Sequence, residues 1–290
     1  MLVRPSIPFV LLFGLLACGR QDESVSTLYF SAIPDQDETR LREKFEPVAR
    51  YLSQALDVNV EYVHASEYKD AIDLFKNGDV QLAWFGGLSG VQARAQVPGA
   101  RAIAQGEEDP NYYSYFIAHR DTGLLPADEF PMGLRGRRFT FGSSGSTSGR
   151  LMPEHFIRMH TGQSPEEFFG AENHYSGSHD QTVELVEAGQ FEAGAVNYMT
   201  YDRRVAEGQT DPEVCRVIWR SPRYPDYNFT AHPDLDRRFG EGFTDRLAQA
   251  LIDMTDEDLL SAFPRKSLIR AEDDDFKDIE AIARQLEFLR

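Results

Sequence analysis

The sequence predicts an α/β fold built as two lobes, because strand and helix signals alternate along its 290 residues. Apolar runs at residues 26–33 and 79–85 are each followed by a polar or glycine-rich turn and then by a helical pattern. The alternation breaks near residue 120 and restarts, and a Pro/Tyr connector lies near residue 222. We therefore expect a first lobe of residues 27–118 plus 222–290 and an inserted second lobe of residues 119–221.

The elements of the first lobe have separate signals. An apolar stripe from Leu41 to Leu56 predicts a helix, in which Pro47 predicts a kink or a later start. Asn77-Gly78 is a good C-terminal stop for a helix that begins at Tyr68. The other expected elements are strands at 58–63 and 112–118, a helix starting at 91–95, and tail helices at 237–254 and 276–288.

In the second lobe the same pattern predicts a strand at 138–141 and a helix at 151–160, joined by a Gly/Ser loop. A further strand and helix unit is expected within 173–201. The strand expected at 214–219 holds Cys215, which we interpret as a small buried apolar side chain. Ligands of open α/β folds bind in the crevice at the C-terminal ends of strands, so the loops there are the candidate site.

The first residues predict a secretory signal peptide, residues 1–17. One cation, Arg4, precedes an apolar stretch shorter than the roughly 20 residues of a spanning helix. The segment ends in Leu-Leu-Ala-Cys, which resembles the bacterial lipobox, so Cys18 is expected to carry a lipid. Residues 18–26 would then be a linker to the inner or outer membrane. The alternative is an ordinary signal peptide with a chance cysteine.

Composition excludes several classes of protein. With 47 acidic against 30 basic residues the net charge is −17, which argues against nucleic-acid binding. The seven histidines show no H-E-x-x-H motif, and no G-x-S-x-G nucleophile motif occurs. A periplasmic hydrolase would need a metal cluster or an activated nucleophile. We therefore expect no catalytic residue, metal or cofactor, and a binding protein rather than an enzyme.

Three loops predict an anion site. The loop Gly142–Leu151 follows a strand, is rich in glycine and hydroxyls, and opens a helix whose free N–H groups favour anions. The segment Ser176–Asp180 repeats this arrangement and adds His179 as a hydrogen-bond donor. Trp84–Ser89 is a third strand end with glycines and a helix start. Each could also be an ordinary capping loop, but three together favour convergence on one anion.

These segments resemble the phosphate- and phosphonate-binding solute receptors of ABC importers, the PhnD-like group, over roughly residues 28–289. The motifs that carry the resemblance are Tyr51-Leu52-Ser53, Glu67-Tyr68, the run 77–86, Ser146–Gly149, Gly177–Asp180 and the segment 188–196. More narrowly, residues 31–37 and 83–90 are similar to a subgroup labelled selenate-binding proteins.

The resemblance implies a two-lobed Venus-flytrap receptor (a type II periplasmic binding protein), with a mixed sheet flanked by helices in each lobe and a cleft between them. Ligand would close the lobes, and the closed, monomeric receptor would dock on a membrane permease. Together with the three loops, it leads us to expect these ligand-binding residues: Tyr68, Gly87, Ser89, Ser146, Thr147, Ser148, His179, Asn197 and Tyr227.

Two departures from the family pattern bear on the ligand. Gly90 stands where many members have tyrosine, and Asn197 stands where aminophosphonate binders have a carboxylate. We therefore expect a small tetrahedral oxyanion, selenate-like, with phosphonate, phosphite or phosphate as the alternative. A fully ionised selenate offers only acceptors and would be repelled by a facing carboxylate. On this reading Asp226, in the connector, should not contact the ligand.

Overall fold

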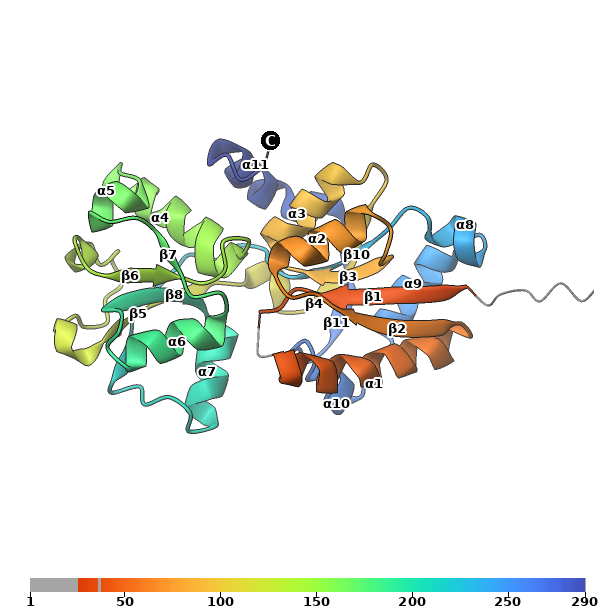
Figure 1. Cartoon of the computed structure of the whole chain (residues 1–290), viewed down its shortest axis with the longest axis horizontal. Helices are drawn as coiled ribbons and strands as arrows, with labels where there is room; N and C mark the ends of the chain where they lie inside the picture. The colour runs from red at the N-terminus through yellow and green to blue at the C-terminus, as the bar shows by residue number, and fades with distance from the viewer. Residues whose placement is uncertain (1–25, 36–37, 290) are drawn as a thin grey trace, which may run out of the picture.

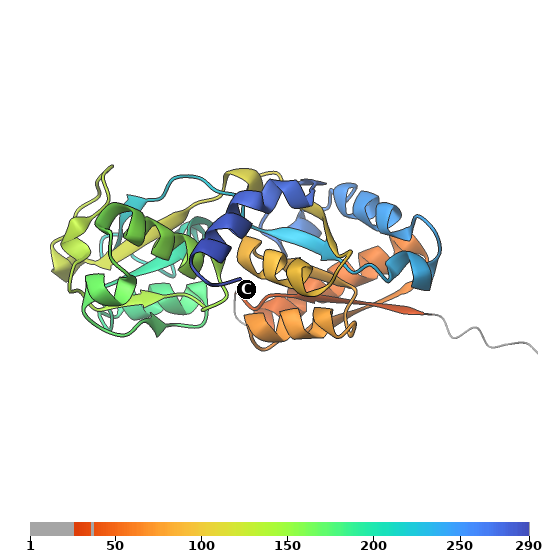
Figure 2. The ribbon, with the colours of Figure 1, turned by 90° about the horizontal axis from the view of Figure 1, so that it is seen from above.

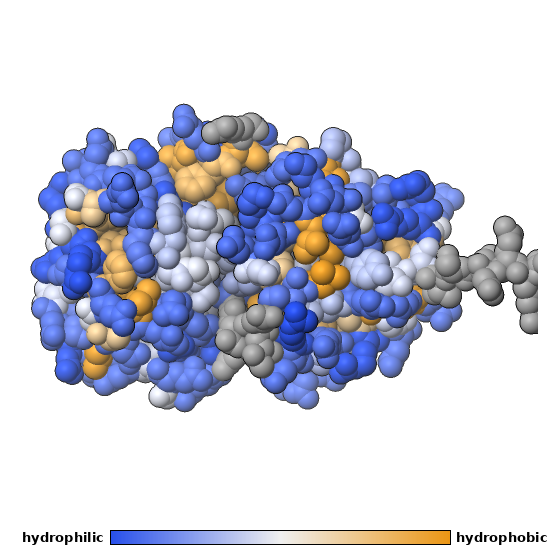
Figure 3. Space-filling view, in the orientation of Figure 1, coloured by the Kyte–Doolittle hydropathy of each residue, from blue (hydrophilic) through white to orange (hydrophobic). Residues whose placement is uncertain are grey.

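The computed structural model describes residues 26–35 and 38–289. The expected signal peptide, Cys18 and the linker up to residue 25 lie outside these residues. Two lobes lie end to end, each a mixed sheet with helices on its faces (Figure 1). The predicted α/β class with two helix-flanked mixed sheets is therefore confirmed. Within the described ranges no helix is long and apolar enough to cross a membrane, and the face in Figure 3 is largely hydrophilic.

The first lobe is built on a six-stranded sheet in the order β11-β4-β10-β3-β1-β2. β1 pairs in parallel with β2 and β3, whereas β10 and β11 run antiparallel to their neighbours. The chain thus returns to this sheet after it has built the second one. The strands are β1 (Thr27–Ala32), β2 (Asn59–His64), β3 (Leu82–Phe85), β4 (Arg101–Gly106), β10 (Asn228–Ala231) and β11 (Leu268–Arg270).

The helices of this lobe differ from the sequence prediction at several points, and the one expected to start at 91–95 begins at Gly87. The first helix runs unbroken through Pro47, so the later start is wrong. The helix expected at 237–254 is two helices, because Gly240 and Gly242 take φ angles of 95° and 73° that end the first. The helices are α1 (Glu38–Leu56), α2 (Tyr68–Lys76), α3 (Gly87–Gln96), α8 (Leu235–Phe239), α9 (Phe243–Ile252), α10 (Glu257–Leu260) and α11 (Lys277–Gln285), with 3-10 turns at Asp109–Asn111 and Asp273–Phe276.

The second lobe is built on a five-stranded sheet in the order β7-β6-β8-β5-β9. Its strands are β5 (Ser114–His119), β6 (Phe139–Phe141), β7 (His174–Tyr175), β8 (Ala193–Asn197) and β9 (Cys215–Arg220). Its helices are α4 (Met152–Thr161), α5 (Pro165–Phe169), α6 (His179–Glu187) and α7 (Tyr198–Ala206), with 3-10 turns at Arg120–Thr122 and Met132–Leu134 and a π-helical turn at Thr147–Leu151. Cys215 is buried, as expected, and burial raises the pKa of its thiol to about 12.

Two segments of chain cross between the sheets. β5 was expected in the first lobe, but it pairs with β8 and β9, so that assignment is wrong for this strand. Its aromatic residues pack against the neighbouring strand of the second sheet, where the Phe116 ring lies 5.2 Å from that of Trp219. The crossing segments meet in an isolated antiparallel bridge between Tyr112 and Tyr224. We accordingly propose lobe limits near residues 107–113 and 221–227.

The C-terminal segment also touches both lobes. Figure 2 shows α11 leading to a chain end close to where the lobes meet. The Gln92 side chain of α3 donates a 2.8 Å hydrogen bond to the Phe288 carbonyl. The Phe288 ring lies 5.1 Å from the guanidinium carbon of Arg150, in the second lobe. The tail therefore borders the interface between the lobes.

A buried ion pair lies next to the two segments that cross between the sheets. Arg265 donates from Nη2 to Asp109 Oδ1 at 2.6 Å, and the two side chains are 2% and 0% exposed. The guanidinium also lies 5.6, 5.3 and 4.8 Å from the rings of Trp84, Tyr112 and Tyr227. Asp109 in turn accepts a backbone hydrogen bond from the Asp226 N–H at 3.1 Å. The pair therefore fixes both crossing segments to the first lobe.

Arg265→Met should destabilise the protein by about 3–5 kcal/mol, because it leaves the Asp109 carboxylate buried without its cation. Urea unfolding measures this change. The matched control is Arg101→Met, which breaks the exposed ion pair with Asp245 and should cost less than about 1 kcal/mol. Equal effects of the two variants would show that the buried pair has no special role.

Candidate functional site

The predicted loops of the two lobes meet at one place. The loop after β6 leads into the π-helical turn that begins at Thr147. The Thr147 hydroxyl accepts a 3.0 Å hydrogen bond from the Leu88 N–H at the start of α3. Ser146 caps that turn by accepting from the Gly149 N–H at 2.9 Å. Ser146 and Thr147 are each 2% exposed. The N-terminal ends of two helical segments from opposite lobes therefore face each other. We call this closed contact between the lobes, around Leu88 and Thr147, the seam.

Asp226, the connector residue that we expected not to contact the ligand, lies in this seam. Its Oδ1 accepts a 2.9 Å hydrogen bond from the Gly87 N–H, and this oxygen and the Thr147 hydroxyl both lie beside Gly86. Its Oδ2 is buried and has no hydrogen-bond partner. Burial raises the pKa of this carboxyl group to about 7. Near neutral pH the group can therefore donate or accept a proton.

His179 stands at the first position of α6, as the Gly-Ser-His-Asp segment predicted. Its Nδ1 accepts the Asn197 N–H at 3.3 Å, so the ring proton of the neutral form is on Nε2. Nε2 lies 3.5 Å from the Ser146 hydroxyl. Burial lowers the pKa of His179 to about 4, and the Asp180 charge only partly opposes this. His179 is thus a neutral donor and does not supply a positive charge.

Asn197 and Tyr227 form a chain of hydrogen bonds across the interface. The Asn197 side chain caps α7 by accepting the Thr200 N–H at 2.7 Å. Its Nδ2 donates to the Tyr227 hydroxyl at 3.1 Å, and that hydroxyl donates to Asp35 Oδ2 at 2.9 Å. Asp35 follows β1 and is buried, and burial raises its pKa to about 6. Two carboxyl groups therefore lie at the interface.

The remaining predicted residues divide into two groups. Tyr68 begins α2, is 4% exposed, and lies against Gly145 of the second lobe, so it belongs to the interface. Ser89 instead exchanges hydrogen bonds with the backbone of Gly86 and caps its own helix. The Ser148 carbonyl accepts a 2.6 Å hydrogen bond from the Ser114 hydroxyl beneath the loop. Ser89 and Ser148 are thus structural in this arrangement, and Gly87 contributes only its backbone N–H.

Glycines allow the close approach of the lobes. A Cβ atom on Gly145 would lie 2.9 Å from the Tyr68 Cβ, which is closer than real contacts. A Cβ atom on Gly86 would lie 3.1 Å from the Thr147 hydroxyl oxygen and 3.2 Å from Asp226 Oδ1. Outside this contact a surface groove of about 750 Å³ runs past Tyr68 and Gly145. Larger side chains at these positions would hold the seam open.

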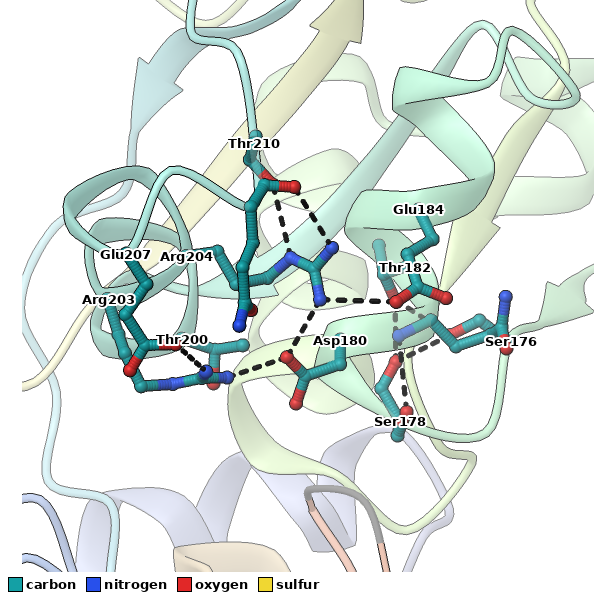
Figure 4. Close-up of polar contacts among 12 residues, drawn as sticks. Ser176, Ser178, Asp180, Thr182, Glu184, Thr200, Arg203, Arg204, Glu207 and Thr210 are labelled. Carbon is teal, nitrogen blue, oxygen red and sulfur yellow. Dashed lines mark hydrogen bonds and ion pairs between the residues drawn. The ribbon is translucent and has the colours of Figure 1, made fainter. Parts of the chain in front are cut away.

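An ion-pair network stabilises α6, the helix that begins at His179. Asp180, the residue after His179, accepts from Arg203 Nη2 at 2.6 Å and from Arg204 Nη1 at 3.1 Å (Figure 4). Arg204 also reaches Glu184 at 3.2 Å and donates to the Thr210 hydroxyl at 3.1 Å. These contacts tie α6 to α7, so they fix His179 relative to Asn197.

The donor set suits reversible binding of a small oxyanion. Hydroxyl groups, backbone N–H groups and a neutral imidazole line the seam, together with two carboxyl groups of raised pKa. Among the described residues no group of three metal-ligating side chains occurs. Sequence reasoning found the three loops but missed Asp35 as a residue of the contact between the lobes. Its position three residues after the end of β1, at the carboxyl edge of the parallel strands, was the signal that could have identified it.

Comparison with known proteins identifies the fold and the family. Residues 30–276 match the family described as "ABC transporter, phosphonate, periplasmic substrate-binding protein". A protein of Prochlorococcus marinus named "Probable ABC transporter phosphite binding protein PhnD1" is 38% identical over 270 residues, 91% of each chain. A Mycolicibacterium smegmatis phosphate-import protein is 26% identical and covers 76% of this chain and 73% of its own.

The solved structures agree. That of PhnD1 from Prochlorococcus marinus, in complex with methylphosphonate, has a TM-score of 0.85 at 38% identity and covers 90% of this chain and 98% of its own. A Pseudomonas aeruginosa component of an ABC phosphonate transporter has a TM-score of 0.76 at 20% identity, covering 88% and 85%, and supports the fold alone. Such proteins bind solutes and are not enzymes. The chain belongs to the periplasmic substrate-binding proteins of ABC phosphonate transporters.

Proposed function

We propose that this protein captures phosphite or a small phosphonate between its lobes and delivers it to an ABC permease. The observation that carries the proposal is Asp226, whose Oδ2 is buried at the seam without a hydrogen-bond partner. We now prefer phosphite or a phosphonate, the alternative named above, to the selenate-like ligand, since the relatives include a protein named for phosphite and a structure with methylphosphonate. None of the relatives compared above is named for selenate.

The chemistry of Asp226 favours a ligand that carries a proton. Selenate and sulfate are fully deprotonated at neutral pH and present only acceptor oxygens. Against them an ionised Asp226 is repulsive, and it must first take up a proton. Phosphite and alkylphosphonates titrate near neutrality, so they can donate a P–OH hydrogen to the free Oδ2. A shared proton then replaces repulsion by a charge-assisted hydrogen bond.

The residues we assign to ligand binding are the interface set. The donors are the Tyr68 hydroxyl, the Ser146 and Thr147 hydroxyls, and His179 Nε2, and Asp226 is the acceptor. Asn197 and Tyr227 complete the set from the two lobes. We assign Gly87, Ser89 and Ser148 to the shape of the loops. The receptor is proposed to act as a monomer that docks on the permease, with Cys18 lipid-anchored to a membrane.

Asp226→Asn should invert the ligand preference. Asn keeps an oxygen for the Gly87 N–H but offers a permanent donor where the carboxyl group stood. Phosphite affinity should fall by roughly tenfold, about 1.4 kcal/mol, whereas sulfate affinity should rise. In the wild type, sulfate affinity should fall as pH rises through about 7, because Asp226 loses its proton there, and the variant should lose this dependence. Isothermal titration calorimetry across pH measures both.

The control for this experiment is Asp121→Asn, which alters a carboxylate that is 80% exposed on the second lobe. It should leave both affinities unchanged. If Asp226→Asn weakened phosphite and sulfate by the same factor, Asp226 would not select for the protonated ligand.

Gly145→Ala should weaken ligand binding without destabilising the ligand-free protein. The added methyl group would contact Tyr68 only when the lobes are closed. We expect at least a roughly tenfold loss of affinity, because part of the binding free energy must be spent on relieving the clash with Tyr68 when the lobes close. Calorimetry and small-angle X-ray scattering with saturating ligand would report affinity and closure. Ser144→Ala, at an exposed neighbouring position, is the control, and equal behaviour of both variants would contradict the steric explanation.

Cys18→Ser should release the protein from the membrane if the lipid anchor is present. Fractionation of cells that express the full chain should find the wild type with the membranes and the variant in the periplasmic extract. An equal distribution of the two would support the ordinary signal peptide instead.

A further inference from the structure

The hydrogen-bond chain through Asn197 has a fixed direction. The Thr200 N–H can only donate, so the Asn197 oxygen must face it at 2.7 Å. The amide nitrogen therefore faces Tyr227, and it donates to the hydroxyl oxygen at 3.1 Å. One lone pair of the Tyr227 hydroxyl oxygen is thus occupied, and the hydroxyl hydrogen must be donated to a different acceptor.

Asp35 receives that hydrogen. The Tyr227 hydroxyl lies 2.9 Å from Asp35 Oδ2, and both side chains are buried. The pKa of Asp35 is raised to about 6 by burial, so at neutral pH the group is still mainly a carboxylate and an acceptor. The backbone oxygen of Asp35 also accepts the His179 N–H at 3.4 Å, at the start of α6. Asp35 is therefore held at the interface, beside the residues assigned to the ligand.

The direction of this chain decides what Tyr227 can offer to a ligand. With its hydrogen committed to Asp35, the hydroxyl has only a lone pair left for a bound oxygen atom. A lone pair repels a fully deprotonated oxyanion and attracts a P–OH hydrogen. Without Asp35 the hydroxyl could rotate and donate its hydrogen to the oxyanion.

We propose that Asp35 is a positioning residue for ligand selection, which holds Tyr227 as an acceptor and so favours an oxyanion carrying a proton over a fully deprotonated one. This inference rests on the proposed function. Asp226 is the residue before Tyr227, but it accepts from the Gly87 N–H and not from the Tyr227 hydroxyl, so the two carboxyl groups act through different hydrogen bonds. The alternative is that Asp35 only stabilises the closed lobes, in which case it would affect all ligands alike.

A double-mutant cycle separates these two roles. Asp35→Ala, Tyr227→Phe and the double variant would be titrated calorimetrically with phosphite, methylphosphonate, sulfate and selenate. We expect Asp35→Ala to shift the ratio of sulfate to phosphite affinity toward sulfate by roughly three- to tenfold, the effect of one gained hydrogen bond. With Phe at position 227, the same substitution should change the ratio by less than about twofold, because no hydroxyl remains to reorient.

Other outcomes overturn the inference. A uniform loss for all four ligands in Asp35→Ala, or the same ratio change with and without the Tyr227 hydroxyl, would show a merely structural role. Asp35→Leu, which also removes the acceptor but fills a similar volume, serves in the same cycle if the alanine variant does not fold. Wild-type protein that binds neither phosphite nor methylphosphonate would refute the proposed function, and this inference with it. Wild-type binding of phosphite together with an unchanged ratio would refute this inference alone.

Discussion

One buried guanidinium, that of Arg265, balances the negative charge of the interface. It makes an ion pair with Asp109, and its charge lowers the pKa of Asp35 and of Asp226 against the effect of burial. Three buried carboxyl groups thus depend on this cation, and two of them keep raised pKa values of about 6 and about 7. The same guanidinium lies over the Tyr227 ring. The fold of the crossing segments and the acidity of the site therefore have a common origin.

This balance explains how an acidic protein can still receive an anion. The net charge of −17 gives no long-range attraction, but distant charges are largely screened beyond a Debye length of about 8 Å. Within the seam the ligand meets neutral donors, namely helix N-termini, hydroxyl groups and the uncharged His179, whose pKa is held near 4 by burial. Recognition therefore depends on short-range hydrogen bonds, and their direction distinguishes a protonated ligand from a bare dianion.

The sequence predicted those parts of the candidate site whose placement follows from local patterns. Ser146, Thr147 and His179 stand in strand–loop–helix segments rich in glycine and hydroxyls, and such segments bring their side chains to the carboxyl edge of a sheet. The place of Asp226 at the interface could not be predicted, because it depends on Asp109, a residue far away in the sequence, which anchors its backbone. The assignment of β5 failed for the same reason, since sheet membership is decided by pairing partners that no local pattern reveals. Gly240 and Gly242, by contrast, carried a local signal for the break between α8 and α9.

The raised and lowered pKa values also connect ligand binding to protons. Asp35 and Asp226 titrate above their ordinary value of 3.8, so the folded protein holds protons that the unfolded chain has released, and these two groups make folding less favourable as pH rises toward about 6 and 7. His179 acts in the opposite sense, because its folded pKa of about 4 lies below its ordinary 6.5, and its contribution to stability grows as pH rises between those values. An anion placed beside Asp226 raises the pKa of that group further. Binding at neutral pH should therefore draw a proton to the boundary between ligand and carboxyl group, and a ligand that brings its own proton avoids that cost.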